Sequence, residues 1–259
     1  MMKRILNIVL TVLLSAGIVF LFVFANTKQN DVLCESFEIN IHYNDAPELI
    51  TKRTIRHQVT ESGIRVKGQP VTSIPVMKLQ KVLSRNPYVK RATISVAVNG
   101  IVTANILQRD PLVRVVDKDY NQCMLDHDGV VMPVNPEFPV RLVVANGNIE
   151  SVRLISAISQ KKANKSLPKD LSQVFRIASM LEKDSLTAAM IEQIYINDRK
   201  EIEMIPKIGD HTIVVGDTLM LGDKMRNLRL FYKEGMKTFA WNNYKEINLK
   251  YKNQIVCSK

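Results

Sequence analysis

An uncharged apolar run near the start of the chain constrains the fold more than any other feature. Ile5 to Ala25 carries no charged residue and directly follows Lys3 and Arg4. As a helix, this run would rise about 31 Å, close to the roughly 30 Å hydrocarbon core of a bilayer. Basic residues before such a helix hold the N-terminus in the cytoplasm. The sequence therefore predicts a cytoplasmic tail at 1–4, a single-pass transmembrane helix at 5–25 and an exported remainder.

A cleaved signal peptide is the alternative interpretation of this run, because Val23-Phe24-Ala25 resembles a small-residue cleavage site. The run is longer than a signal-peptide h-region of about 7–15 residues, which favours an uncleaved anchor. Cys34 could indicate a lipoprotein, but no small residue precedes it and a polar segment separates it from the apolar run.

Charge and cysteine usage narrow the classes of partner and site. The chain has a formal net charge of +11, and without Lys3 and Arg4 the exported part holds 34 basic and 25 acidic residues, or +9. This favours contact with anionic lipid headgroups or an acidic partner, although a scattered, solvated cationic surface is the simpler reading. Nucleic acid is not expected outside the membrane. The cysteines fit neither a disulfide framework nor a zinc site, being odd in number and far apart: Cys34, Cys123 and Cys257.

The first exported segment follows the order β-α-α-β-β. Its strands alternate apolar and polar residues, and its helices carry apolar residues three or four positions apart. The expected elements are a strand at Ser36–Tyr43, a helix from Thr51 that stops at Ser62-Gly63, a helix at Ser73–Ser84, and strands at Lys90–Val98 and Ile101–Gln108. Asn99-Gly100 supplies the positive φ angles of a two-residue type I′ turn, so we expect the last two strands to form a tight hairpin.

Beyond Pro111 the sequence favours strands over helices. The expected strands are Leu112–Val116, Asn121–Leu125, Val130–Val134, Ile191–Asn197, Glu201–Pro206 and His211–Val215, and the expected helices are Asp170–Leu181 and about Asp223–Met236. The first of these helices has an apolar stripe for core packing, formed by Leu171, Val174, Phe175, Ala178 and Leu181.

Asp126, His127 and Asp128 stand side by side in front of Gly129, which raises the question of metal or acid-base chemistry. A metal needs three or four convergent ligands, and acid-base catalysis needs a partner group. The other histidines have no ligand spacing to His127, and an EF-hand loop spaces its ligands and glycine differently. Because Asp128-Gly129 separates two β-forming runs, we predict a hairpin turn in place of a catalytic or metal site.

The C-terminal segment Lys245–Val256 is predicted to form one amphipathic strand. One face would pack on the domain and the other would meet solvent: Ile247, Leu249, Tyr251 and Ile255 on the first, and Glu246, Asn248, Lys250, Lys252 and Gln254 on the second. At a sheet edge, the free N–H and C=O groups of this strand could pair with a strand of another chain. An ordinary strand protected by its lysines is the alternative.

The β-α-α-β-β order resembles a POTRA domain. The stretch RNPYVKRATISVAVNGIVTANILQRDP, Arg85–Pro111, is similar to the end of that module, with an Asn-Pro-aromatic-Val step into the hairpin and an Arg-x-Pro exit. The resemblance implies a POTRA domain at 32–109 and a mostly β domain with a few helices at 110–259. The expected fold class is therefore α+β, preceded by a single N-terminal transmembrane helix.

Nearly the whole chain resembles the FtsQ/DivIB family of bacterial cell-division proteins in its Bacteroidetes form. The stretches that carry the likeness are QRDPLVRV (Gln108–Val115), MLDHDGVVMP (Met124–Pro133), MIEQIYIN (Met190–Asn197), EIEMIPKIGDHTIVVGD (Glu201–Asp217) and INLKYKNQIVCSK (Ile247–Lys259). The cytoplasmic tail of about four residues is short, so a contact made by a longer tail in relatives is not carried over.

The resemblance implies a non-enzymatic scaffold of the divisome at the septum, without catalytic residues, cofactor or metal. Its exported domains would lie in the periplasm, anchored in the inner membrane, and its POTRA domain would contact other divisome components. In this family the β domain binds FtsB, itself paired with FtsL, by adding a strand at its C-terminal edge.

The family's contact motif falls on Ile247, Asn248, Leu249, Lys250, Tyr251, Asn253 and Gln254. Lys250 and Asn248 stand where the family often has arginine and aspartate, so the resemblance implies a point-charge contact in place of a bidentate grip on a partner carboxylate. Tyr251 would supply an apolar anchor, and Lys250 would attract an acidic partner segment.

Two other classes of function are considered. A POTRA-bearing envelope assembly or secretion factor normally continues into a membrane barrel with aromatic girdles, whereas this chain begins with an apolar helix and has one Trp. A membrane-anchored cell-wall hydrolase needs a nucleophile with a base, a metal triad or two carboxylates in a cleft. No such constellation can be read from the sequence, although catalytic groups distant in sequence can converge.

Overall fold

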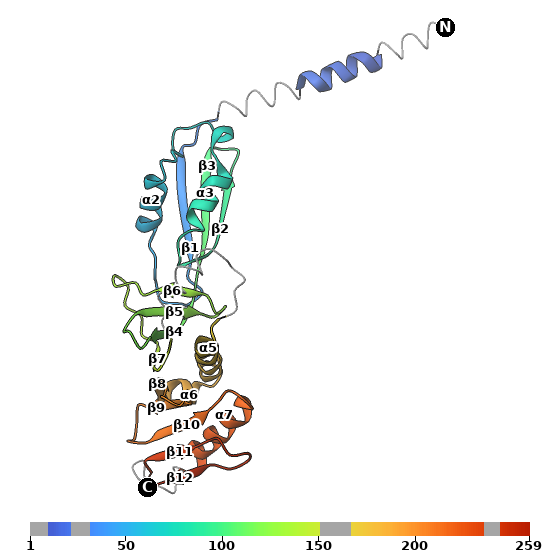
Figure 1. Ribbon diagram of the computed structural model, residues 1–259. Coiled ribbons are helices and arrows are strands. Elements are labelled where there is room, and N and C mark those ends of the chain that lie inside the picture. Colours follow the sequence, from blue (N-terminus) through green and yellow to red (C-terminus); the bar gives the residue numbers. More distant parts are fainter. Residues whose placement is uncertain (1–9, 22–31, 151–166, 236–243) are drawn as a thin grey trace. The chain divides into compact units, whose positions relative to one another are not determined.

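The computed structural model describes residues 10–21, 32–150, 167–235 and 244–259 (Figure 1). Chain contacts divide it into two compact units: a first unit of residues 1–42 and 50–108, and a second unit of residues 43–49 and 109–259. Each unit has its own hydrophobic core.

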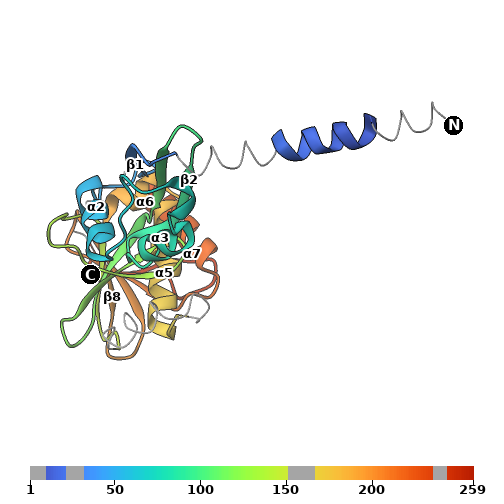
Figure 2. The same ribbon diagram turned by 90° about the horizontal axis from the view of Figure 1, so that it is seen from above.

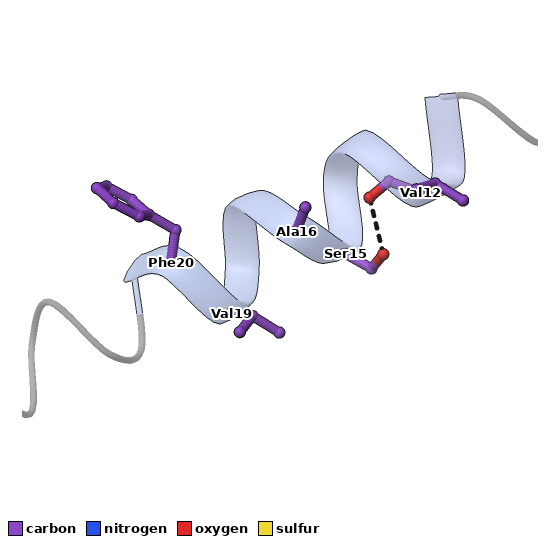
Figure 3. Close-up of a pocket in the computed structure, with 5 residues that line it drawn as sticks. All are labelled: Val12, Ser15, Ala16, Val19 and Phe20. Carbon is purple, nitrogen blue, oxygen red and sulfur yellow. Dashed lines mark hydrogen bonds between the residues drawn. The ribbon is translucent and has the colours of Figure 1, made fainter.

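Residues 10–21, from the middle of the predicted transmembrane run, form a helix whose side chains are exposed. In Figure 3 a shallow recess on this helix is lined by four apolar residues and Ser15, whose Oγ donates to the carbonyl of Val12 (2.9 Å). A hydroxyl bonded to its own helix backbone is compatible with an apolar surround. The rest of the run lies outside the described residues, and no helix within them has the length and apolar character needed to cross a membrane.

The first unit is a three-stranded sheet with two α-helices on one face (Figures 1 and 2). Its elements are β1 (Ser36–His42), α2 (Lys52–Glu61), the 3₁₀ turn η1 (Val71–Ser73), α3 (Val76–Leu83), β2 (Val89–Val96) and β3 (Ile101–Gln108). The strand order is β1-β3-β2, with β1 parallel and β2 antiparallel to the central β3. Helix α2 packs over β1 and α3 over β2. The predicted β-α-α-β-β order is confirmed.

Local signals account for the bounds of the two helices. Thr51 caps α2 by accepting a hydrogen bond from the N–H of Thr54, and Gly63 follows its end with φ +71°. Helix α3 begins at Val76, later than the predicted Ser73. The reason is Pro75, which has no N–H and holds the preceding Ile74 in an extended conformation (ψ 122°).

The hairpin between β2 and β3 is confirmed, but its predicted two-residue type I′ turn is wrong. Ala97 N–H bonds to the carbonyl of Ile101 (2.9 Å) and Gly100 N–H to that of Ala97 (3.1 Å), so three residues form the connection. Gly100 alone among them has positive φ, at +83°, and Asn99 instead accepts a hydrogen bond from Ile101 N–H through Oδ1. This is the geometry of a type I turn followed by a left-handed residue.

The second unit is built on a nine-stranded mixed sheet. Its strands are β4 (Pro111–Val116), β5 (Gln122–Asp126), β6 (Val131–Pro133), β7 (Val143–Gly147), β8 (Ile191–Ile196), β9 (Ile202–Pro206), β10 (Thr212–Gly216), β11 (Glu246–Asn248) and β12 (Val256–Ser258). The spatial order is β12-β11-β10-β9-β8-β7-β4-β5-β6. The pairs β4–β7, β7–β8 and β10–β11 are parallel, and the other pairs are antiparallel.

Helices cover one face of this sheet (Figure 1). They are α5 (Lys169–Glu182), α6 (Ser185–Met190) and α7 (Leu221–Leu230), which a π turn, η2 (Phe231–Gly235), continues. The predicted stripe of α5 is buried in the core, with Phe175 partly so, and Ile177 joins it. The predicted helix Asp223–Met236 starts two residues early, and Met236 lies outside the described residues.

The C-terminal prediction of one strand over Lys245–Val256 is wrong. Strand β11 stops at Asn248, the chain turns, and β12 returns antiparallel to it. Both sides of β11 are occupied, by β10 and by β12, so the edge of the sheet is β12.

Candidate partner-binding edge

Strand β12 ends the nine-stranded sheet and, within the described residues, pairs with β11 alone. It is three residues long, and Val256 is 43% exposed. The opposite end of the sheet, β6, is also a three-residue strand, but its Val131 and Met132 are buried. A short exposed edge leaves backbone donors and acceptors for a strand of another molecule.

The hydrogen bonds of β11 decide which backbone groups of β12 point outward. Thr212 N–H bonds to the carbonyl of Lys245, and Leu249 N–H bonds to that of Val214, each at 2.8 Å. These bonds aim alternate residues of β11 at β10 and leave Glu246 and Asn248 aimed at β12. Their antiparallel partners are Ser258 and Val256.

Because backbone groups alternate in an antiparallel strand, the N–H and C=O of Cys257 point away from β11. The carbonyl of Ser258 points toward β11, where it also accepts from Lys245 N–H (2.9 Å). The side chain of Cys257 is half-buried against the core. One donor and one acceptor therefore lie at the centre of the open rim of β12.

Local side-chain chemistry ends β11 and turns the chain back. Asn248 Oδ1 accepts from the N–H of Lys250 (3.0 Å), a local bond that competes with continued strand pairing. Asn253 adopts a left-handed conformation (φ +60°), which asparagine tolerates better than most residues. The alternating pattern of the sequence therefore continues through a segment that is not a strand.

The structure separates the seven predicted contact residues into two groups. Ile247 and Leu249 are 0% and 2% exposed and belong to the core of the second unit. Asn248 is half-buried and donates to Glu246 (3.0 Å). The exposed members are Lys250, Tyr251, Asn253 and Gln254, which all lie on the loop between β11 and β12.

Lys250 is engaged within its own unit. Its Nζ donates to Glu201 Oε1 (2.8 Å), and its methylene chain lies over Gly216, where an added Cβ would approach to 2.7 Å. This hydrogen bond raises the pKa of Lys250 and lowers that of Glu201. Lys250, which was predicted to attract an acidic partner, therefore already forms an ion pair with Glu201 of its own unit.

A recess of about 190 Å³ lies between the β11–β12 loop and the segment that joins β10 to α7. Leu219 and Met220 on that segment are 69% and 54% exposed, and Tyr251 across the recess is 50% exposed. Nearby, Asp217 pairs with Lys224 (2.8 Å), and this hydrogen bond lowers the pKa of Asp217. Sequence reasoning missed Leu219 and Met220, although two apolar residues after Gly216-Asp217, outside the expected strand and helix, were a readable signal of exposure.

The Asp126-His127-Asp128 motif forms the predicted turn. Asp126 is 1% exposed, and its Oδ1 accepts from the N–H groups of Asp128 (2.9 Å) and Val130 (2.7 Å). Its Oδ2 accepts from Arg109 (2.7 Å). His127 instead faces Asp110 (3.3 Å) and Glu182 (3.2 Å). Across the described residues, no group of histidine, cysteine or carboxylate side chains is arranged to hold a metal ion.

Comparison with family models matches two parts of the chain. The model described as FtsQ/DivIB, C-terminal related, matches residues 110–258, which include every strand of the nine-stranded sheet. The chain belongs to this FtsQ/DivIB-related family. A POTRA-like domain model matches residues 32–107, and no curated protein matches the sequence.

Membership indicates the broad class of function. FtsQ/DivIB proteins are non-enzymatic scaffolds of cell division that take part in divisome protein interactions. The mixed α+β fold, with a POTRA-like domain followed by a mostly β domain, is the arrangement expected from the resemblance.

Proposed function

We propose that this protein is a non-enzymatic divisome scaffold that binds a partner of the FtsB/FtsL kind by β-strand addition at β12. The observation that carries the proposal is the outer rim of β12, which no described strand occupies and which ends the sheet matched by the family. Main-chain pairing at such a rim supplies affinity and orientation, and neighbouring side chains supply specificity.

The loop before β12 supplies the side chains for this contact. Tyr251 is a large exposed aromatic residue, and Asn253 and Gln254 follow it with exposed amides. Aromatic residues of this kind often carry a large share of binding energy at an interface. We therefore assign the contact to Tyr251, Asn253, Gln254 and the rim of Val256–Ser258, with the buried Ile247 and Leu249 as structural support.

The proposal includes a membrane anchor at 5–25, with the N-terminus in the cytoplasm and the remaining residues in the periplasm at the division septum. Its support is the uncharged apolar run after Lys3 and Arg4, together with membership of a family of division-site membrane proteins. Contacts of the POTRA-like domain with other divisome components belong to the same proposal.

Proline at Cys257 tests strand addition directly. Cys257→Pro removes the outward N–H while the inward bonds of Val256 and Ser258 stay available, and proline is tolerated on edge strands. Cys257→Ala is the matched control, because it removes the thiol and keeps the N–H.

The measurement is copurification of the full chain with FtsB- and FtsL-like proteins from membrane extract of its own organism, after circular dichroism has established that both variants are folded. We expect capture by the wild type and by Cys257→Ala and a loss of about tenfold or more for Cys257→Pro. Equal capture by the two variants would refute strand addition at β12, and absence of these proteins from the wild-type eluate would refute the choice of partner.

A further inference from the structure

The first unit contains a groove that is separate from β12 and is not used in the function proposed above. It has a volume of about 790 Å³ and lies between the last turns of α2, the start of β1 and the loop that follows α2. Its apolar lining consists of Phe37, Val59, Ile64 and Val66, of which the last three are buried. A groove of this size and lining accommodates apolar side chains of a ligand.

The charged residues that line the groove are all cationic. Arg56 extends from α2, and Arg65 and Lys67 from the loop after it, and all three are exposed. No carboxylate among the described residues forms an ion pair with any of them. Three cations without an internal partner around an apolar floor favour an acidic ligand that also carries apolar groups.

The groove adjoins an open strand edge. β1 is the terminal strand of its sheet, and its pairing with β3 is on one side only. Just before β1, the chain itself occupies that outer side: Cys34 N–H bonds to the carbonyl of Gln69, and Gly68 N–H to that of Cys34, each at 2.8 Å. This pairing ends at Gly68, and within the described residues the outer side of Ser36–His42 has no strand beside it.

We propose that this groove, the β1–α2 groove, binds an extended acidic peptide segment of a partner protein. The backbone of the peptide would pair with the open side of β1, continuing the line of the internal Gly68–Gln69 pairing. Its apolar side chains would enter between Phe37 and Val59, and its acidic side chains would meet Arg56, Arg65 and Lys67. Strand addition at a sheet edge combines main-chain pairing with pockets that receive side chains of the added strand.

This inference deepens one part of the proposed function, the contact of the POTRA-like domain with other division proteins. It uses no residue of the second unit. Strand addition at β12 can therefore fail while the β1–α2 groove binds, and the groove can fail while β12 binds.

The test measures binding of a fluorescent ten-residue peptide, Glu-Val-Glu-Ile-Asp-Val-Glu-Ile-Glu-Val, to the full purified chain by anisotropy at low and high salt. The charge-reversed variant is R56E/R65E/K67E. Its matched control is R53E/K78E/R91E, which makes the same change of charge at exposed positions of the same unit that do not line the groove. Thr60→Trp fills the groove without changing charge, because Thr60 is exposed and lines it.

We expect the affinity for the peptide to fall about tenfold or more in R56E/R65E/K67E and in Thr60→Trp, and to change by less than about threefold in the control. Equal losses of affinity in both triple variants would mean that net charge alone attracts the peptide, which would overturn the proposal. Unchanged peptide binding by Thr60→Trp would overturn it as well. Vesicles containing phosphatidylglycerol provide a second probe. Binding to these vesicles through Arg56, Arg65 and Lys67, without binding of the peptide, would identify a lipid site and also overturn it.

Discussion

Gly100 occupies a position that other residues cannot take without strain. It has φ +83°, and a Cβ added there would lie 2.5 Å from the backbone oxygen of Leu33. Gly100→Ala would therefore force an alanine into the left-handed backbone conformation and place its Cβ against the backbone oxygen of Leu33. We expect it to lower the free energy of unfolding of the first unit by about 3 kcal/mol or more, measured by urea denaturation.

Gly63 is the control that separates backbone strain from this clash. It has a similar φ of +71°, but an added Cβ would meet no atom within 4 Å. Gly63→Ala should therefore lose only about 1–2 kcal/mol. Equal losses at the two positions would contradict a clash between residue 100 and Leu33.

Sequence reasoning at the scale of single residues succeeded where chemistry is local. Thr51 was expected to start a helix and caps it, and Asp128-Gly129 was expected to form a turn and does so. It failed at Asn99, because the positive φ angles that Asn-Gly permits are not required when a three-residue connection fits the strands.

Among the secondary-structure elements, the segment from β11 to β12 shows why an alternating pattern is an incomplete guide. Alternation predicts burial only in part: Ile247 and Leu249 are buried as expected, but Tyr251, which was expected on the same packed face, is 50% exposed. It cannot show where a strand ends, because Asn248 and Asn253 turn the chain without breaking the pattern. It also missed β7 and α6, a five-residue strand and a six-residue helix with little periodicity.

The consequence for the candidate site is specific. The C-terminal region was identified from the sequence, and Tyr251, Asn253 and Gln254 are exposed there. The sequence placed the edge strand at Lys245–Val256, but the edge strand of the structure is β12. The reason is that the chain turns back after β11 and β12 pairs with its open side. Such pairing depends on tertiary structure and leaves no periodic signal in the sequence.

The Lys250–Glu201 pair connects the loop after β11 to the residue just before β9, and its contribution to stability should depend on pH. The folded state lowers the pKa of Glu201, so the stabilisation is present above its ordinary value of 4.5 and is lost as the pH falls through the folded pKa. The pKa of Lys250 is raised, so stabilisation is also lost above its ordinary value of 10.5, as the pH rises through its folded pKa.

Lys250→Met keeps most of the side chain over Gly216 and removes the charge. We expect its melting temperature to lie below that of the wild type at pH 7, with the difference shrinking as the pH falls below 4.5 and Glu201 becomes protonated in the folded state. Lys252→Met is the control, because Lys252 is exposed and forms no ion pair with a described residue. A difference for Lys250→Met that persists unchanged at low pH would assign the effect to packing.

Tyr251 tests the side-chain part of the proposed contact. Because Tyr251 is 50% exposed, Tyr251→Ala should leave the melting temperature nearly unchanged. Affinity for an FtsB-like peptide should fall by about 2 kcal/mol, or roughly thirtyfold, in isothermal titration calorimetry. Tyr120 is 84% exposed elsewhere in the second unit, so Tyr120→Ala, which also removes an exposed tyrosine, should bind normally. Equal affinity of Tyr251→Ala and the wild type would remove Tyr251 from the contact.

In the molecule as a whole, each unit carries a sheet with a terminal strand that pairs on one side within the described residues: β1 in the first unit and β12 in the second. Exposed edges of this kind invite aggregation unless a partner, a charge or a bulge protects them. At β1 the neighbouring loop supplies Arg65 and Lys67, and at β12 the open strand is only three residues long. These features limit uncontrolled pairing at the two edges, and under the proposals above they leave each edge to a specific partner.

Residue-resolved hydrogen exchange tests the pairing at β12 most directly. The full chain would be compared alone and in a saturated complex with its FtsB-like partner, following the amides of Val256, Cys257 and Ser258. The account predicts strong slowing of exchange at Cys257, whose N–H points outward, and little change at Val256 and Ser258, which already face β11. Unchanged exchange at Cys257 in the saturated complex would contradict strand addition.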